Sequence, residues 1–214
     1  FKRFRTDDII GKELTASRIA FLRDAAAAKA PSRVIEIAAL HALRKFDDYE
    51  SDYFEKSIAV IERIALLFLV TTPPLTARYN RVFGLVTAMN SNASLDGLDL
   101  SEEEKRQIMT TLDTTDWGET PTSRRCIKAV LRRLNDAELH KTSESRVASS
   151  PNPLTVEHIL PQEPSETSRW KSDWSDDDVR REWVHRLGNL CVLNQRKNSS
   201  VNNIDFAEKS QFYG

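Results

Sequence analysis

The chain has 214 residues, 40% of them hydrophobic, and a formal net charge of −1 from 31 basic and 32 acidic side chains. This length allows one large domain or two small ones, and balanced charge with ample apolar content excludes a chain that is disordered by composition. A protein that binds polyanions through its overall charge is excluded as well, so nucleic acid would have to be held by a local basic surface.

The cysteines, the apolar runs and the amino terminus exclude further classes. Cys126 and Cys191 are the only cysteines and form no CxxC pair, which argues against a zinc finger and indicates a reducing compartment. The longest apolar run, Ile64 to Val70, is far shorter than the ~20 residues that a membrane span needs. The start, Phe1-Lys2-Arg3, carries no signal-peptide pattern, so we expect an excised part of a longer cytosolic protein.

Residues 1–138 read as helical. A helix is expected from about Pro31 to Phe46, because apolar residues recur at helical spacing behind a proline suited to a helix start. Ser51 can cap the next helix, which is apolar on most faces towards its end and is therefore expected at the centre of a bundle. Thr71 to Pro74 ends that helix, and another runs from about Leu75 to Met89.

Breaks and a capping box divide the following stretch. Asn90 to Leu100 is a polar loop, and Ser101 with Glu104 forms a capping box that opens the next helix. Asp113 to Thr122 contains a glycine and a proline and is a second break. The last helix of this part is expected over Ser123–Glu138.

The helix expected over Ser123–Glu138 carries a concentration of positive charge. One side presents an apolar stripe at i, i+3, i+4 and i+7 spacing. The other side carries four basic residues: Arg124, Arg125, Lys128 and Arg132. The default interpretation is a solvated helix face, and the sharper one is a face that docks on DNA through its phosphates.

The sequence pattern changes after residue 140. Lys141 to Pro153 is rich in Ser, Thr and Pro without an apolar period, which is typical of a linker. Short β-like runs, Thr155–Leu160 and Leu190–Leu193, flank an insertion with a helix capped by Ser175–Asp178, and Ser199–Tyr213 is expected to end in a helix. The expected division is a helical region over 1–140, a linker over 141–154 and a second domain over 155–214.

The segment Val156–Gln162 holds the most informative pair of the chain, Glu157 followed by His158. Asn189 comes 31 positions after the histidine, and Asn198 follows nine positions later. Imidazole can take a proton from water near neutral pH, and carboxylate and amide oxygens suit Mg²⁺ or Mn²⁺. A lone histidine near a proline turn is most often structural, but this set matches the needs of a single-metal phosphodiester hydrolase.

The pattern resembles the HNH, or ββα-metal, nuclease motif. Residues 185–190 (HRLGNL), 198–200 (NSS) and 206–209 (FAEK) are similar to the carboxy-terminal domain of GmrSD-type restriction proteins, whose relatives include phosphorothioation-linked anti-phage nicking nucleases. The resemblance is specific over 155–214 and general over 1–138. It implies a mostly α protein, with a helical bundle followed by a small ββα-metal (HNH, or His-Me finger) nuclease domain.

The resemblance also implies roles for the motif residues. His158 would be the general base that activates water. Glu157 and Asn198 would hold one Mg²⁺ or Mn²⁺ ion, which places Asn198 in the catalytic set with His158. Asn189 would fix the loop that presents His158 through hydrogen bonds to the backbone.

Three further side chains are weaker candidates. His185 matches the motif of the family, which implies that it contacts phosphate or supports the loop. The alternative is a structural cap at a helix carboxy terminus. Gln162 is a supporting candidate, and Lys209 could reach a phosphate. Many HNH proteins carry a zinc-binding cysteine set that this chain lacks, so its insertion is expected to supply stability by packing three tryptophans: Trp170, Trp174 and Trp183.

The leading hypothesis is a metal-dependent HNH endonuclease that nicks double-stranded DNA. It would be the effector part of a bacterial, cytoplasmic restriction or anti-phage system. The resemblance implies an amino-terminal nucleotide-hydrolysing regulatory domain outside this chain, which has no GxxxxGK[ST] pattern of its own. The alternatives are a catalytically silent helical module that binds DNA or a partner, and an HNH nuclease that acts on RNA.

Overall fold

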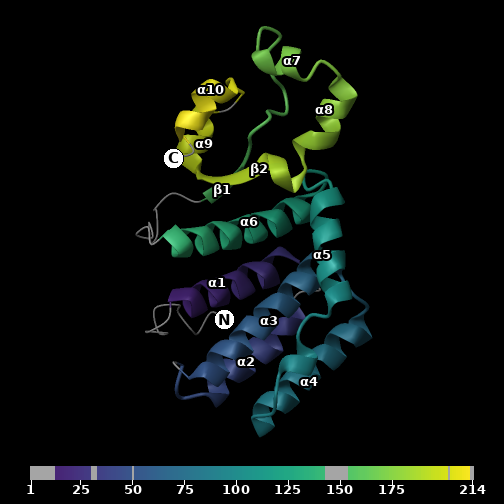
Figure 1. The fold of residues 1–214 in the computed structure, drawn as a ribbon, viewed down its shortest axis with the longest axis vertical. Helices are drawn as coiled ribbons and strands as arrows, with labels where there is room; N and C mark the ends of the chain where they lie inside the picture. The colour runs from purple at the N-terminus through teal and green to yellow at the C-terminus, as the bar shows by residue number, and fades with distance from the viewer. Residues whose placement is uncertain (1–12, 30–32, 50, 143–153, 202, 213–214) are drawn as a thin grey trace. The chain divides into compact units, whose positions relative to one another are not determined.

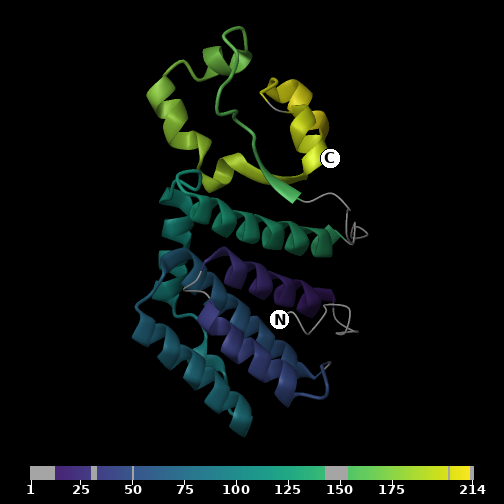
Figure 2. The same cartoon turned by 180° about the vertical axis from the view of Figure 1, so that it is seen from behind.

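The computed structural model describes residues 13–29, 33–49, 51–142, 154–201 and 203–212. They fall into two compact units, unit 1 up to Thr111 and unit 2 from Leu112 onward. The described residues are mostly helical, with a single two-stranded sheet in unit 2, as the sequence predicts (Figures 1 and 2). No helix in the described ranges is long and apolar enough to cross a membrane.

Unit 1 is a bundle of helices arranged around α3. Its helices are α1 (Glu13–Ala28), α2 (Ile35–Lys45), α3 (Asp52–Thr71), α4 (Leu75–Ser91) and most of α5 (Glu102–Thr114), with a short η3 (Asp96–Leu98) before α5. α3 packs against α1, α2 and α4, and its residues from Ser57 onward are buried on nearly all sides. The predicted central position of this helix is therefore confirmed.

Local capping explains where two of these helices begin. The Ser51 hydroxyl accepts a hydrogen bond from the Phe54 amide at 3.3 Å, at the start of α3. At the start of α5, the Ser101 amide donates to the Glu104 carboxylate at 2.8 Å and the Glu104 amide donates back to the Ser101 hydroxyl at 3.2 Å. The predicted capping box is thus present, and it satisfies amides that the helix itself leaves without a partner.

Unit 2 places a small antiparallel sheet among helices. Its elements are α6 (Pro121–Thr142), β1 (Leu154–His158), α7 (Arg169–Asp173), α8 (Asp177–Val184), η4 (Leu187–Asn189), β2 (Leu190–Asn194), α9 (Gln195–Val201), α10 (Phe206–Lys209) and η5 (Ser210–Phe212). The strands pair with Glu157 opposite Cys191 and His158 opposite Leu190. Residues paired in this way share a face of the sheet, while neighbours along a strand alternate between faces.

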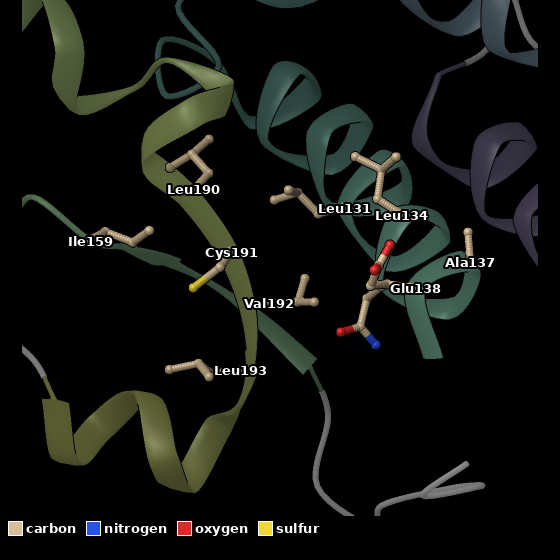
Figure 3. A pocket seen from close by; sticks show the side chains of 10 residues that line it. Leu131, Leu134, Ala137, Glu138, Ile159, Leu190, Cys191, Val192 and Leu193 are labelled. Carbon is tan, nitrogen blue, oxygen red and sulfur yellow. The ribbon is translucent and has the colours of Figure 1, made fainter. Parts of the chain in front are cut away.

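The sheet lies between α6 on one face and α9 with α10 on the other (Figures 1 and 2). The side chains of Leu190 and Val192 point towards α6, whereas those of Cys191 and Leu193 point the other way (Figure 3). This alternation fixes which motif residues can meet, because His158 shares the α6 side with Leu190.

The division of the chain differs from the predicted one. The boundary falls between Thr111 and Leu112 rather than near residue 140, because α6 packs against both strands and so belongs with the sheet. Of the predicted linker over 141–154, Lys141 and Thr142 belong to α6 and Leu154 to β1, while residues 143–153 lie outside the described ones.

α10 and η5 form the helical end that was expected for Ser199–Tyr213. The helix that directly follows β2 is α9, which begins at Gln195 and was not expected. The Asn194 side chain accepts a hydrogen bond from the Lys197 amide at 2.8 Å, which is an N-cap contact at the start of this helix. Asn198 therefore lies inside α9, where its side chain can reach back to β1.

Only part of the predicted tryptophan packing is present. The Trp170 indole donates to the Ile204 carbonyl at 3.2 Å and meets the Phe206 ring edge to face at 6.2 Å between centroids. Trp183 is 49% exposed, so the prediction that it packs in the insertion is wrong. Its place is on the outer side of the short helix α8, which turns Val184 inward instead.

Candidate functional site

His158 is the last residue of β1, at the point where the strand leaves its partner. Because successive strand residues face opposite sides, Glu157 and His158 have different surroundings although they are neighbours in sequence. Glu157 is 6% exposed on the side of Cys191, and His158 is partly exposed on the side of Leu190. The motif thus divides into an imidazole site and a carboxylate site on the two faces of one sheet.

The His158 imidazole is held between two polar side chains. Its Nε2 lies 3.0 Å from Nδ1 of His185, and its Nδ1 lies 3.2 Å from Nε2 of Gln162. The two imidazole rings meet edge to face, with centroids 5.0 Å apart and planes at 78°. His185 is partly buried and Gln162 is exposed, so the Nδ1 edge of His158 is the one on the solvent side.

The surroundings of His158 keep its ring neutral. Burial, which is the largest cause, together with the neighbouring His185 and the Lys209 ammonium lowers the pKa of the imidazole from 6.5 to about 4, while Asp116 acts in the opposite direction. At neutral pH the ring therefore has one nitrogen lone pair that can accept a proton. A phosphate anion beside the ring would favour the charged form and raise this pKa towards the working range of a base.

The loop before α6 supports His185, although the sequence indicated only a break over Asp113–Thr122. The Trp117 amide donates to the His185 carbonyl at 3.1 Å. Gly118 lies so close to the imidazole that a Cβ there would come within 2.1 Å of His185 Nδ1. The Asp116 carboxylate accepts from the Gly118 amide at 2.8 Å and holds the turn. The only sequence feature that pointed to this support was a glycine in a short break between helices, and it did not indicate that the glycine packs against His185.

Asn189 ties the segment after His158 to the rest of the site. Its Oδ1 accepts from the Leu160 amide at 2.6 Å, and its Nδ2 donates to the Leu160 carbonyl at 3.0 Å and to the Val184 carbonyl at 2.8 Å. Its own carbonyl accepts from the Ile159 amide at 2.9 Å. These are backbone bonds of the kind that the family resemblance implies, and they fix where the strand end presents His158.

Glu157 forms a buried ion pair with Lys209 on the other face of the sheet. The Lys209 ammonium, 0% exposed, donates to Glu157 Oε1 at 2.8 Å and to the His158 carbonyl at 2.7 Å. Burial raises the pKa of the Glu157 carboxyl, and the ammonium opposes that rise. The prediction of a phosphate contact for Lys209 does not fit this structure, because α10 turns the side chain inward and leaves it no access to a ligand in solvent.

Asn198 reaches from α9 to the same face of the sheet as Glu157. Its Nδ2 donates to the Thr155 hydroxyl at 2.8 Å and to the Val156 carbonyl at 3.2 Å. Thr155 and Glu157 share a face because they are two apart on the strand. Since its nitrogen is engaged with β1, the amide oxygen of Asn198 is the atom suited to a cation.

Glu157 and Asn198 carry oxygen donors of the kind that hard divalent cations bind. Within the described residues, no group of three or more His, Cys, Asp or Glu side chains could hold a metal ion. Mg²⁺, however, is commonly held by one or two protein oxygens and completes its shell with water and substrate phosphate. Glu157 and Asn198 carry two such oxygens, but the Lys209 ammonium occupies Glu157 Oε1 and the carboxylate is buried.

The basic residues predicted for DNA lie on α6. Arg124 and Arg125 are exposed, and Lys128 and Arg132 are partly buried. Arg124 Nη1 donates to the Gly118 carbonyl at 2.6 Å, so it lies beside the loop that supports the His158 site. Arg125 Nη2 donates to the Thr122 hydroxyl at 3.0 Å at the start of the helix.

A pocket of about 550 Å³ separates part of α6 from the sheet (Figure 3). Its lining is mostly apolar: Leu131, Leu134, Asn135, Ala137, Glu138, Ile159, Leu190, Cys191, Val192 and Leu193. Of these residues, Leu134 on α6 is 53% exposed. None of the predicted site residues lines this pocket, so it is separate from the imidazole and carboxylate sites.

His158 supplies an imidazole that can accept a proton, and Glu157 supplies a carboxylate on the opposite face of the same sheet. A comparison with protein families matches residues 104–214 to the family described as GmrSD restriction endonucleases, C-terminal domain. The match covers more than half of the chain and includes all of unit 2. The chain therefore belongs to this family.

As a member of this family, the chain is part of a restriction endonuclease, which is a phosphodiester hydrolase whose substrate is DNA. No curated protein and no solved structure matches the chain. The match begins within α5, well before the predicted nuclease domain at residue 155, which agrees with the grouping of α6 with the sheet.

Proposed function

We propose that the chain is an HNH-type, metal-dependent endonuclease that nicks double-stranded DNA, with His158 as the general base. The observation that carries the proposal is the neutral imidazole of His158 at the end of β1, with its Nδ1 edge towards solvent. The strand–strand–helix order of β1, β2 and α9 supports a ββα-metal fold, and both asparagines of the motif bond to the strand that carries His158 or to the segment after it.

In the proposed reaction, His158 takes a proton from a water molecule that attacks phosphorus in line. The new P–O bond forms as the P–O3′ bond breaks, so the products carry 5′-phosphate and 3′-hydroxyl ends. Asn189 holds the backbone that positions the base. The motif implies that Glu157 and Asn198 would hold the Mg²⁺ or Mn²⁺ ion, which would supply positive charge to the phosphate. Because Lys209 is bonded to Glu157 Oε1 and the carboxylate lies on the face opposite His158, this role requires the carboxylate to leave the lysine and turn towards the strand end.

Arg124 is the best placed of the basic residues to bring DNA to this site. It is exposed and bonds to the loop that supports His185. Phosphate contacts of this kind orient a duplex without reading its sequence. A single imidazole site cuts one strand at a time, so a nick is the expected elementary product.

We also propose that a nucleotide-hydrolysing regulatory domain controls the nuclease. The family description names a C-terminal domain, which supports a further domain in the whole restriction protein. The expected setting is a bacterial restriction or anti-phage system in which that domain reports modified DNA and releases the nuclease.

The test is a supercoiled-plasmid assay with Mg²⁺ or Mn²⁺. The intact chain should convert supercoiled plasmid to open circles, and His158→Ala should abolish this, because the base is removed. His41→Ala in unit 1 is the matched control, since it removes an imidazole that has no part in the site. A chelator should stop the reaction, and readdition of the metal should restore it.

Four outcomes would count against the proposal. Cutting by His158→Ala at the rate of the intact chain would refute the base. Cutting in chelator would refute the metal. No cutting of DNA under any divalent metal, together with cutting of an RNA of the same sequence, would identify an RNA nuclease, and no cutting of either would favour a silent binding module.

A further inference from the structure

His185 touches the nitrogen of His158 that faces away from solvent. A neutral imidazole carries its proton on one nitrogen and a lone pair on the other, and a hydrogen bond to one nitrogen decides which. Gln162 Nε2 lies 3.2 Å from His158 Nδ1, and an amide N–H can only donate. Its donation leaves the proton of His158 on Nε2, from where it points at His185 Nδ1 at 3.0 Å.

His185 is itself held firmly enough to act as a fixed acceptor. The Trp117 amide binds its carbonyl, and Gly118 lies directly against its ring. Arg124 binds the Gly118 carbonyl from α6 and braces the same loop. The guanidinium of the next residue, Arg186, donates to the Thr114 and Asp113 carbonyls, which adds a second tie between this turn and the segment before α6.

We propose that His185 is a positioning residue that keeps the proton of His158 on Nε2, so that the Nδ1 lone pair faces the attacking water. The inference rests on the proposed function, in which His158 is the general base. Gly118 supports this position of His185, because only a residue without a Cβ lets the loop approach the imidazole so closely.

The proton balance of this arrangement is simple. Water gives one proton to Nδ1 of His158 as its oxygen bonds to phosphorus, and the leaving 3′ oxygen takes a proton from solvent. The imidazolium formed keeps its Nε2–H bond to His185, which accepts throughout and neither gains nor loses a proton. Gln162 is exposed and has to turn away from Nδ1 when water takes its place.

Two amide substitutions test the role by geometry. In His185→Asn the amide oxygen takes the place of Nδ1 and can still accept from His158, whereas in His185→Gln the amide lies farther out, near the Nε2 position. We expect His185→Asn to keep plasmid nicking within about threefold of the intact chain. We expect His185→Gln and His185→Phe to lose about 10- to 100-fold, the range for residues that orient a reacting group, with the loss in kcat rather than in KM.

A glycine substitution tests the support without removing either histidine. Gly118→Ala should reduce kcat to the level of His185→Phe, because its Cβ displaces the ring. Gly97→Ala is the matched control, since a Cβ there meets nothing within 4 Å. Tryptophan fluorescence checks that unit 2 is folded in the Gly118 and His185 variants, because all four tryptophans lie there, and far-UV circular dichroism checks the helices of the Gly97→Ala control.

A spectroscopic measurement tests the inference independently of activity. Two-bond ¹⁵N–¹H correlation spectra of histidine-labelled chain should show His158 as the Nε2–H form, and His185→Phe should shift its population towards Nδ1–H. An Nδ1–H form in the intact chain, or equal activity of the Asn, Gln and Phe variants, would overturn the role of His185. Retained cutting by His158→Ala would instead overturn the proposed function, so the two failures are distinct.

Discussion

Removal of the Lys209 ammonium should destabilise unit 2 strongly. The ammonium is 0% exposed, Glu157 is 6% exposed, and the two are joined at 2.8 Å, with a further bond of 2.7 Å to the His158 carbonyl. Lys209→Met preserves most of the side-chain volume but leaves a buried carboxylate and a buried carbonyl without their donor. Removal of one partner of a buried pair typically costs about 3–5 kcal/mol, which is a large share of the ~5–15 kcal/mol that stabilises a domain.

The double variant separates the ion pair from the packing around it. In Glu157→Leu with Lys209→Met both charges are gone, and such replacements are often neutral or stabilising. We therefore expect the double variant to be more stable than Lys209→Met alone, by about 2 kcal/mol or more. Arg181→Met is the matched control, because it breaks a pair with Asp178 in which both side chains are well exposed, and such pairs contribute at most ~1 kcal/mol.

Urea unfolding followed by tryptophan fluorescence measures these differences in unit 2, since Trp117, Trp170, Trp174 and Trp183 all lie there. The reasoning fails if Lys209→Met costs less than about 1 kcal/mol, or if the effects of the two single substitutions simply add in the double variant. Either result would mean that Glu157 is solvated in the native protein and not held by the lysine.

The remaining predictions concern the asparagine, a thiol and the basic helix. Asn189→Ala should lower the unfolding free energy in urea by about 2–3 kcal/mol, because buried backbone groups lose their partner, and should stop nicking; a stable but inactive variant would contradict the structural role. Burial and the nearby Glu157 carboxylate raise the pKa of the Cys191 thiol to about 11. At about pH 8 its thiolate should therefore be about a hundredfold scarcer than that of an ordinary thiol, and its alkylation rate should rise about tenfold per pH unit up to that pKa. An alkylation rate that levels off near pH 9 would contradict the raised pKa. Arg124→Ala with Lys128→Ala should flatten the slope of log affinity for DNA against log salt by about 2 if both contact phosphate, and an unchanged slope would exclude this face as the docking surface.

The relation between Glu157 and His158 illustrates how far sequence reasoning could go. The spacing of His158, Asn189 and Asn198 indicated a constellation. The structure ties Asn189 to the segment after His158, whereas Asn198 bonds to Thr155 and Val156, earlier on the same strand. Strand alternation places the two neighbours on opposite faces, whereas the motif interpretation had them serve one centre. The partners of these two residues could not be predicted. Lys209 lies 52 positions after Glu157 and His185 lies 27 positions after His158, and no local sequence pattern indicates either contact.

The predicted boundaries were wrong where a helix belongs to a unit because of the surface that it packs against. α6 reads as the last helix of a helical region, yet its apolar stripe packs on the sheet and joins it to unit 2. α9 has almost no apolar periodicity over Gln195–Val201, so its pattern did not indicate a helix; its cap at Asn194 and its contacts with both strands place it there. Local pattern detects an amphipathic helix, but it does not say which surface the helix covers.

By itself the sequence determined the local structure and the chemical inventory. Helix caps at Ser51 and Ser101, two short strands and the Glu-His-Asn-Asn spacing follow from side-chain bonding and periodicity within a few residues. Tertiary structure alone decided which groups meet: that Lys209 is buried against Glu157 and not open to phosphate, and that Gly118 supports His185 beneath His158. The physical reason is that burial and ion pairing depend on segments far apart in the chain, whose approach is decided by the packing of the whole unit.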